Sequence, residues 1–216
     1  MKSLHGIDIE RIQAFSDAVF AIAITLLALE ITVPEHLPMA ELGHALRAEA
    51  LPSAAGYLLS FVAVGALWIA HHRLFRMTKV VDGPLLYLDL ALMALVAALP
   101  FPTKIVTEYH GSAIATSLYA GTIAVAALLI AAMATRLLQR PSLRGTDIPR
   151  ALFTQSLQHA AGVALVFGSS VPVAVIISSD AAEYWWLLAV PVRYCLGRHH
   201  ISTSKHAAVA PSHPAP

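Results

Sequence analysis

Several ionisable side chains of this 216-residue chain stand inside long apolar stretches, where a charge is costly and therefore indicates a function. They are Asp17, Glu30, Asp89 and the adjacent pair His71 and His72. A series of such groups could pass protons across a membrane, as in a proton-coupled transporter or a proton leak pathway. In the simpler interpretation, Glu30 reaches the membrane surface and Asp89 only neutralises basic groups between helices.

Catalytic chemistry is a second candidate, because Ser16, Asp17 and His71 are the residue types of a nucleophilic site. Neighbouring residues on a helix point about 100° apart, however, so Ser16 and Asp17 give no triad geometry. His71 and His72 also point apart, whereas two metal ligands on one helix prefer an i, i+4 spacing. The single cysteine, Cys195, argues against a zinc–cysteine site. We therefore expect no enzymatic activity, no cofactor and no resident metal.

The chain contains six apolar runs, and the Asp, Glu and His residues named above lie in the first three of them. Hydrophobic residues make up 57% of the chain and charged residues only 12%, whereas about a quarter of a soluble domain is charged. A transmembrane helix needs about 20 mostly apolar residues. The predicted spans lie near residues 13–33, 53–75, 84–104, 112–136, 153–178 and 182–197. The sequence thus predicts an all-α membrane protein with one six-helix domain, residues 1–198.

The loop charges predict the orientation of the spans. Of the fourteen Lys and Arg residues, only Arg47 and Lys104 fall in the loops after the first and third spans. Basic residues accumulate on the cytoplasmic side of membrane proteins, so both termini are predicted to be cytoplasmic. The loop 34–51 could form a short amphipathic helix on the outer surface. Residues 199–216, rich in Ala, Pro, Ser and His, are predicted to form a disordered tail.

The sixth span is the weakest of the six predictions, because it is short and contains Pro191. Tyr184, Trp185 and Trp186 nevertheless stand where an aromatic belt at the membrane interface would lie. An odd number of spans would also destroy the alternation of loop charge.

The first span has two distinct faces. At about 100° per residue, Ile22, Leu26 and Leu29 fall on one face together with Thr25. Asp17 lies about 140° from Ile22. Because a carboxylate cannot face lipid cheaply, we expect it to turn towards a partner helix. The apolar face is then free to contact lipid, a neighbouring helix or a symmetry axis.

The expected partners of Asp17 are Trp68, His71 and His72 at the cytoplasmic end of the second span. A hydrogen bond from an indole or imidazole N–H would hold the carboxylate and fix the rotation of the first helix.

The first span begins with Arg11 and Phe15-Ser16-Asp17, continues as an apolar run as far as Leu27, and ends at Glu30-Ile31. This pattern closely resembles the first helix of the prokaryotic relatives of lysosomal transmembrane protein 175, a family of potassium-permeable channels. Further matches are Leu67–Phe75 in the second span and Leu99–Thr103 at the end of the third. The resemblance covers the six-span layout and is specific over roughly the first half of the chain.

The resemblance implies a homotetramer in which the first helix of each subunit lines a central pore. Matched by position, Ile22 forms the main constriction, Leu26 and Leu29 form further apolar layers, and Thr25 supplies a hydroxyl layer. The resemblance also implies a structural network that packs the first helix on its neighbours. Its residues are Arg11, Phe15, Ser16 and Asp17, with Trp68 and His71 as the partners expected from the second span.

The function expected from these residues is a potassium-permeable leak channel of the plasma membrane. The chain has no Thr-Val-Gly-Tyr-Gly loop, so a filter of backbone carbonyl rings is not expected. An ion would pass an apolar neck after losing part of its water, which potassium releases more readily than sodium does. No span carries a ladder of arginines, so steep voltage gating is not expected. The expected partners are K+, the lipid bilayer and other copies of the chain, and the net charge of +1 gives no reason to expect nucleic acid.

Overall fold

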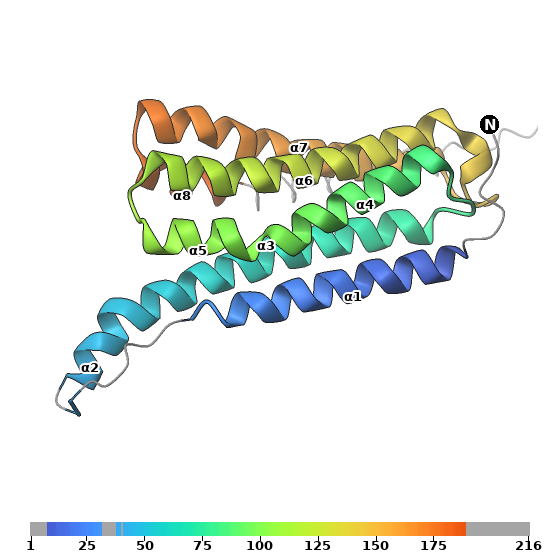
Figure 1. Cartoon of the computed structure of the whole chain (residues 1–216). Coiled ribbons are helices and arrows are strands. Elements are labelled where there is room, and N and C mark those ends of the chain that lie inside the picture. Colours follow the sequence, from blue (N-terminus) through green and yellow to red (C-terminus); the bar gives the residue numbers. More distant parts are fainter. Residues whose placement is uncertain (1–7, 32–37, 40, 189–216) are drawn as a thin grey trace, which may run out of the picture.

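The computed structural model describes residues 8–31, 38–39 and 41–188, and the elements in these ranges are helical. In chain order they are α1 (Ile9–Ala28), α2 (Leu42–Ala45), the π-helical turn η1 (Leu46–Ala50), α3 (Leu51–Arg76), α4 (Gly83–Ala98), α5 (Pro100–Glu108), α6 (Ala113–Gln139), the 3-10 turn η2 (Pro141–Leu143), α7 (Arg150–Ile176) and α8 (Ser179–Trp186). The long helices run side by side in an elongated bundle, and α2 with the start of α3 projects beyond one end of it (Figure 1).

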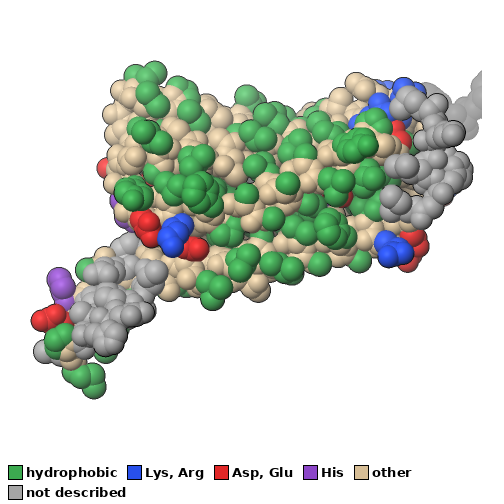
Figure 2. Space-filling model, viewed as in Figure 1, with side chains coloured by type: hydrophobic (Ala, Val, Ile, Leu, Met, Phe, Trp, Pro, Cys, Tyr) green, Lys and Arg blue, Asp and Glu red, His purple; other side chains and the backbone are tan. Residues whose placement is uncertain are grey.

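Five helical segments of the described chain are long and apolar enough to cross a membrane. They are Ile9–Ala28, Leu42–Arg76, Gly83–Glu108, Ala113–Gln139 and Arg150–Ile176. Hydrophobic side chains cover the middle of the bundle surface in Figure 2, whereas charged side chains gather at its two ends. Of the sixth predicted span, 182–197, the structure describes only the part up to residue 188, in and after the eight-residue helix α8. The predicted tail 199–216 lies outside the described residues.

The observed helix limits differ from the predicted ones at two places. The first helix starts at Ile9 because Asp8 caps it, accepting a hydrogen bond from the Glu10 N–H at 3.3 Å, and it ends at Ala28 rather than near residue 33. The third predicted span is divided into α4 and α5 at Leu99. Pro100 follows directly, and a proline ring removes a helical hydrogen bond and crowds the preceding turn.

The helices α6 and α7 form the centre of the packing. Helix α6 presents small buried side chains on several faces, and it packs closely along α7. Small residues allow helix backbones to approach each other, which is how helices associate in lipid. The buried alanines of α6 are Ala115, Ala120, Ala124, Ala126, Ala127, Ala131 and Ala134. Helix α1 lies at the periphery and packs only on one side, against α3, α4 and α5.

Asp82 joins the start of α4 to the end of α6. Its Oδ1 accepts the Leu85 N–H at 3.1 Å and caps α4, while its Oδ2 lies 2.6 Å from Arg136 Nη2. We expect Asp82→Ala to lower the free energy of unfolding by about 2 kcal/mol, because it removes both the cap and the ion pair. Asp82→Ser keeps a capping oxygen and should lose about half as much. Thermal unfolding in detergent measures both, and an unchanged melting temperature for Asp82→Ala would contradict this role.

Candidate functional site

Helix α1 buries one stripe of side chains and exposes another. Its buried residues are Ile12, Ser16, Phe20, Ala23 and Leu27, which face the neighbouring helices. In Figure 1, α1 lies along one edge of the bundle beside α3. The stripe that faces the protein therefore follows the helical period and leaves the opposite side of α1 without a partner in the single chain.

The four residues expected to line a pore all lie on that unpartnered side. The exposed fraction is 59% for Ile22, 41% for Leu26 and 75% for Leu29, and Thr25 is also exposed. The Thr25 hydroxyl donates to the Ile22 carbonyl at 2.8 Å, so it returns to the backbone one turn below. Its oxygen remains able to accept from water or to approach a cation. The exposed edge is thus apolar with one oxygen layer.

On another side of α1, Asp17 is held by α3. The indole N–H of Trp68 donates to Asp17 Oδ1 at 2.8 Å, and His72 Nδ1 lies 3.9 Å from the same oxygen. The Trp68 and His72 rings also contact each other, with centroids 5.4 Å apart. These contacts fix Asp17 to one turn of α3.

The expectation that His71 is a partner of Asp17 is wrong, because His71 faces a different helix. Its Nε2 lies 2.7 Å from Oδ1 of Asp89 on α4. Adjacent residues on α3 point about 100° apart, so only one of the two histidines can face Asp17. Phe20 and Phe75 flank the His71 ring, at centroid distances of 5.7 and 4.4 Å.

Ser16, His71 and Asp89 form a buried polar cluster that joins α1, α3 and α4. The Ser16 hydroxyl donates to Asp89 Oδ2 at 3.2 Å, and all three side chains are buried. Asp89 accepts from two helices at once, so it satisfies the polar groups that these helices bring into the apolar interior. The interpretation of Asp89 as a neutraliser of basic groups between helices agrees with its contact with His71, whereas its contact with Ser16 was missed.

Arg11 and Phe15 lie on the exposed side of α1. Phe15 is 52% exposed and next to the apolar edge, rather than packed on α3 or α4. The six residues expected to form one structural network around the first helix therefore belong to separate groups of contacts within one subunit. Ser16 and His71 contact Asp89, and Asp17 contacts Trp68. Among the described residues, no hydrogen bond or ion pair joins Arg11 or Phe15 to either group.

At the opposite end of α1, Glu30 pairs with a residue of α5. Lys104 Nζ lies 3.6 Å from Glu30 Oε2 and 3.9 Å from Glu108 Oε1. Both Lys104 and Glu108 are half exposed, as expected for charges at a membrane surface. No group of three or more metal-ligating side chains occurs among the residues for which the structure gives positions. A continuous row of ionisable groups along α1 is not seen in these contacts.

Comparison with known proteins identifies what this arrangement resembles. The model of the family described as endosomal/lysosomal potassium channel TMEM175 matches residues 11–100, the stretch that contains α1, α3 and α4. A potassium channel of Streptomyces collinus is 36% identical over 196 residues, covering 84% of this chain and 93% of that relative. A potassium channel of Chamaesiphon minutus is 42% identical over 138 residues, covering 59% of this chain and 68% of that relative.

A solved structure has the same fold. The crystal structure of a lysosomal potassium-selective channel TMEM175 homologue from Chamaesiphon minutus matches with a TM-score of 0.72 and 30% sequence identity. The match covers 87% of this chain and 97% of that one, so the likeness extends over most of both chains.

Proposed function

Because this chain belongs to the TMEM175 family, whose members are ion channels and not enzymes, we propose that it is a potassium-permeable leak channel. It is a multi-pass membrane protein. In the proposed assembly, four copies surround an axis and each contributes α1 to a central pore. The observation that carries the proposal is the exposed apolar edge of α1, formed by Ile22, Leu26 and Leu29, on a helix whose other sides are fixed by polar contacts.

The proposed topology has six spans with both termini in the cytoplasm, residues 1–198 as the channel domain and 199–216 as a tail. A cluster of arginines supports this topology. One end of the bundle, where α3 and α6 end and α7 begins, carries Arg73, Arg76, Arg136 and Arg150. A basic end faces the cytoplasm in most membrane proteins. Placement in the plasma membrane is a further part of the proposal.

Ion passage in this proposal depends on an apolar constriction. Four Ile22 side chains around the axis offer no oxygen ligands, so the ion keeps part of its water shell as it passes. Potassium holds that shell more weakly than sodium does, which makes the neck moderately selective for potassium. The Thr25 hydroxyl, one turn away and on the same exposed side, supplies an oxygen where the ion can be partly coordinated.

The contacts on the remaining sides of α1 set its rotation. The Trp68–Asp17 hydrogen bond and the buried Ser16–Asp89 contact lie on the sides that face α3 and α4. A rotation of α1 by one residue, about 100°, would replace Ile22 at the axis by a neighbouring side chain. We therefore assign Asp17 and Trp68 to assembly of the pore rather than to ion contact.

Loss of the Asp17–Trp68 contact should impair assembly more than conduction. Asp17→Ala removes the acceptor and Trp68→Phe removes only the donor, so each should lower stability by about 2 kcal/mol. We expect fewer tetramers in size-exclusion chromatography for both variants, with an unchanged potassium-to-sodium permeability ratio in the channels that form. Normal tetramers with altered selectivity would contradict this division of roles.

The function itself is tested by ion flux into liposomes that contain the purified protein. We expect passive potassium flux that follows the electrical gradient, slower sodium flux, and no requirement for a proton gradient. Obligatory coupling to protons would instead favour a transporter that uses Asp17, Asp89 and the histidines. If the liposomes showed no potassium, sodium or proton flux, the proposed function would be wrong.

A further inference from the structure

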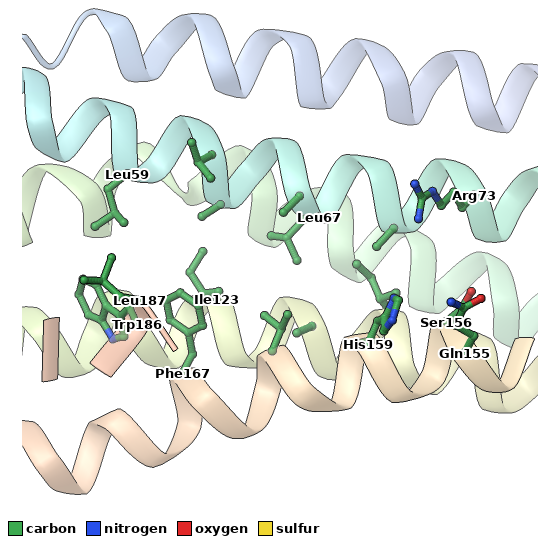
Figure 3. Close-up of a pocket in the computed structure, with 18 of the residues that line it drawn as sticks. Leu59, Leu67, Arg73, Ile123, Gln155, Ser156, His159, Phe167, Trp186 and Leu187 are labelled. Carbon is green, nitrogen blue, oxygen red and sulfur yellow. The ribbon is translucent and has the colours of Figure 1, made fainter. Parts of the chain in front are cut away.

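A long groove runs between α3 and α7 on the side of α3 away from α1, with α6 at its base (Figure 3). Its volume is about 1000 Å³. The walls are almost entirely apolar and include Leu59, Leu67, Ile123, Val163 and Phe167. Trp186 and Leu187 border one end of the groove in Figure 3. An apolar groove of this length along membrane-spanning helices is suited to a hydrocarbon chain.

The other end of the groove is polar and basic. Figure 3 shows Arg73 from α3 near Gln155, Ser156 and His159 from α7, and Arg76 follows one turn after Arg73. Arg73 and Arg76 are both exposed, and neither forms an ion pair with a carboxylate of the described residues. Two neighbouring guanidinium groups with no counter-charge are thus placed where the hydrocarbon groove meets the end of the bundle.

Two other arginines at this end of the bundle, Arg136 and Arg144, already have partners within the protein. Arg136 pairs with Asp82, and Arg144 donates to the Leu137 and Leu138 carbonyls at the end of α6. The chain after Glu183 contains no Asp or Glu and adds Arg193, Arg198 and Lys205. A negatively charged group from outside the chain would complement the charge of Arg73 and Arg76.

We propose that this groove binds an anionic phospholipid of the cytoplasmic leaflet. The phosphate lies between Arg73 and Arg76, within reach of the Gln155 amide, and an acyl chain lies along Leu67, Ile123 and Phe167. Guanidinium groups bind phosphate with charge-assisted hydrogen bonds, and basic pockets between transmembrane helices on the cytoplasmic side recognise anionic headgroups. The chemistry requires a phosphate with net negative charge on a lipid that has acyl chains.

The test compares the melting temperature of the purified full-length protein titrated with phosphatidylglycerol or with phosphatidylcholine. The wild-type protein should be stabilised by phosphatidylglycerol at concentrations about tenfold lower, and Arg73→Gln with Arg76→Gln should abolish that difference. The matched control is Arg140→Gln with Arg150→Gln, which removes two exposed arginines at the same end but outside the groove. Equal stabilisation by both lipids, or equal losses in the two double variants, would overturn the proposal.

A second measurement identifies the occupant of the groove. In a Cys195→Ser background, Val163→Cys should be protected from a bilayer-soluble maleimide by phosphatidylglycerol and not by phosphatidylcholine. With Cys195 retained, a disulfide between positions 163 and 195 in lipid-saturated protein would show that the chain's own C-terminal segment occupies the groove. That result would overturn the lipid assignment, and the ion-flux assay would still report independently on the channel.

Discussion

Ile22→Asn is expected to raise cation flux about tenfold and to bring the potassium-to-sodium permeability ratio close to one. Four asparagine amides at the neck would bind water and cations, whereas four isoleucine side chains offer no ligand to either. A tenfold rise needs the barrier to fall by only about 1.4 kcal/mol, which is small compared with the cost of partly dehydrating an ion. Single-channel recording in planar bilayers under mixed potassium and sodium gradients measures both quantities.

The matched control for this substitution is Leu165→Asn, at a residue of α7 that is 72% exposed and distant from α1. It introduces the same polar group on an apolar surface and should leave the permeability ratio unchanged. If Ile22→Asn has no greater effect than Leu165→Asn, the Ile22 layer does not form the constriction.

Asp89→Ala is expected to have the largest effect on stability. The substitution leaves the buried His71 imidazole and the Ser16 hydroxyl without their acceptor. Removing one member of a buried polar pair costs about 3–5 kcal/mol, which is a large part of the 5–15 kcal/mol that stabilises a typical domain. We expect little folded protein after extraction, measured as the monodisperse fraction in fluorescence-detected size-exclusion chromatography.

Two further variants test whether the loss of folded protein comes from the hydrogen bonds of Asp89 or from the removal of any carboxylate. Asp89→Asn keeps an acceptor oxygen at the same position and should retain more folded protein than Asp89→Ala. Asp147→Ala removes an exposed carboxylate from the loop before α7 and should behave like the wild-type protein. Equal yields for Asp89→Ala and Asp147→Ala would contradict the structural role of the buried cluster.

The apolar runs, and the prolines and polar loops between them, predicted most of the helices of the fold. The structure divides α4 from α5 just before Pro100, as a proline within a helical pattern predicts. The periodicity of Ile22, Leu26 and Leu29 predicted one face of α1, but a single chain does not distinguish a face against lipid from a face against other copies. That distinction depends on intersubunit contacts, which no pattern within one helix encodes.

The polar partners of α1 were less predictable, because partner choice depends on the rotation of each helix. His71 and His72 have the same residue type and nearly the same depth, yet one contacts Asp89 and the other lies near Asp17. A difference of about 100° on α3 decides between them, and sequence spacing alone gives no absolute rotation. The groove between α3 and α7 was missed for the same reason, since it is formed by residues from separate helices.

The central claim is that the exposed edge of α1 lines an ion pathway, and cysteine accessibility tests it most directly. In a Cys195→Ser background, Ile22→Cys, Leu26→Cys and Leu29→Cys would each be exposed to silver ions during recording of potassium current. We expect silver to block all three variants, and to leave unaffected both the Cys195→Ser parent and Ala23→Cys, a buried position about 100° from Ile22 on α1. Persistent potassium current through silver-treated Ile22→Cys, Leu26→Cys and Leu29→Cys channels would contradict the account.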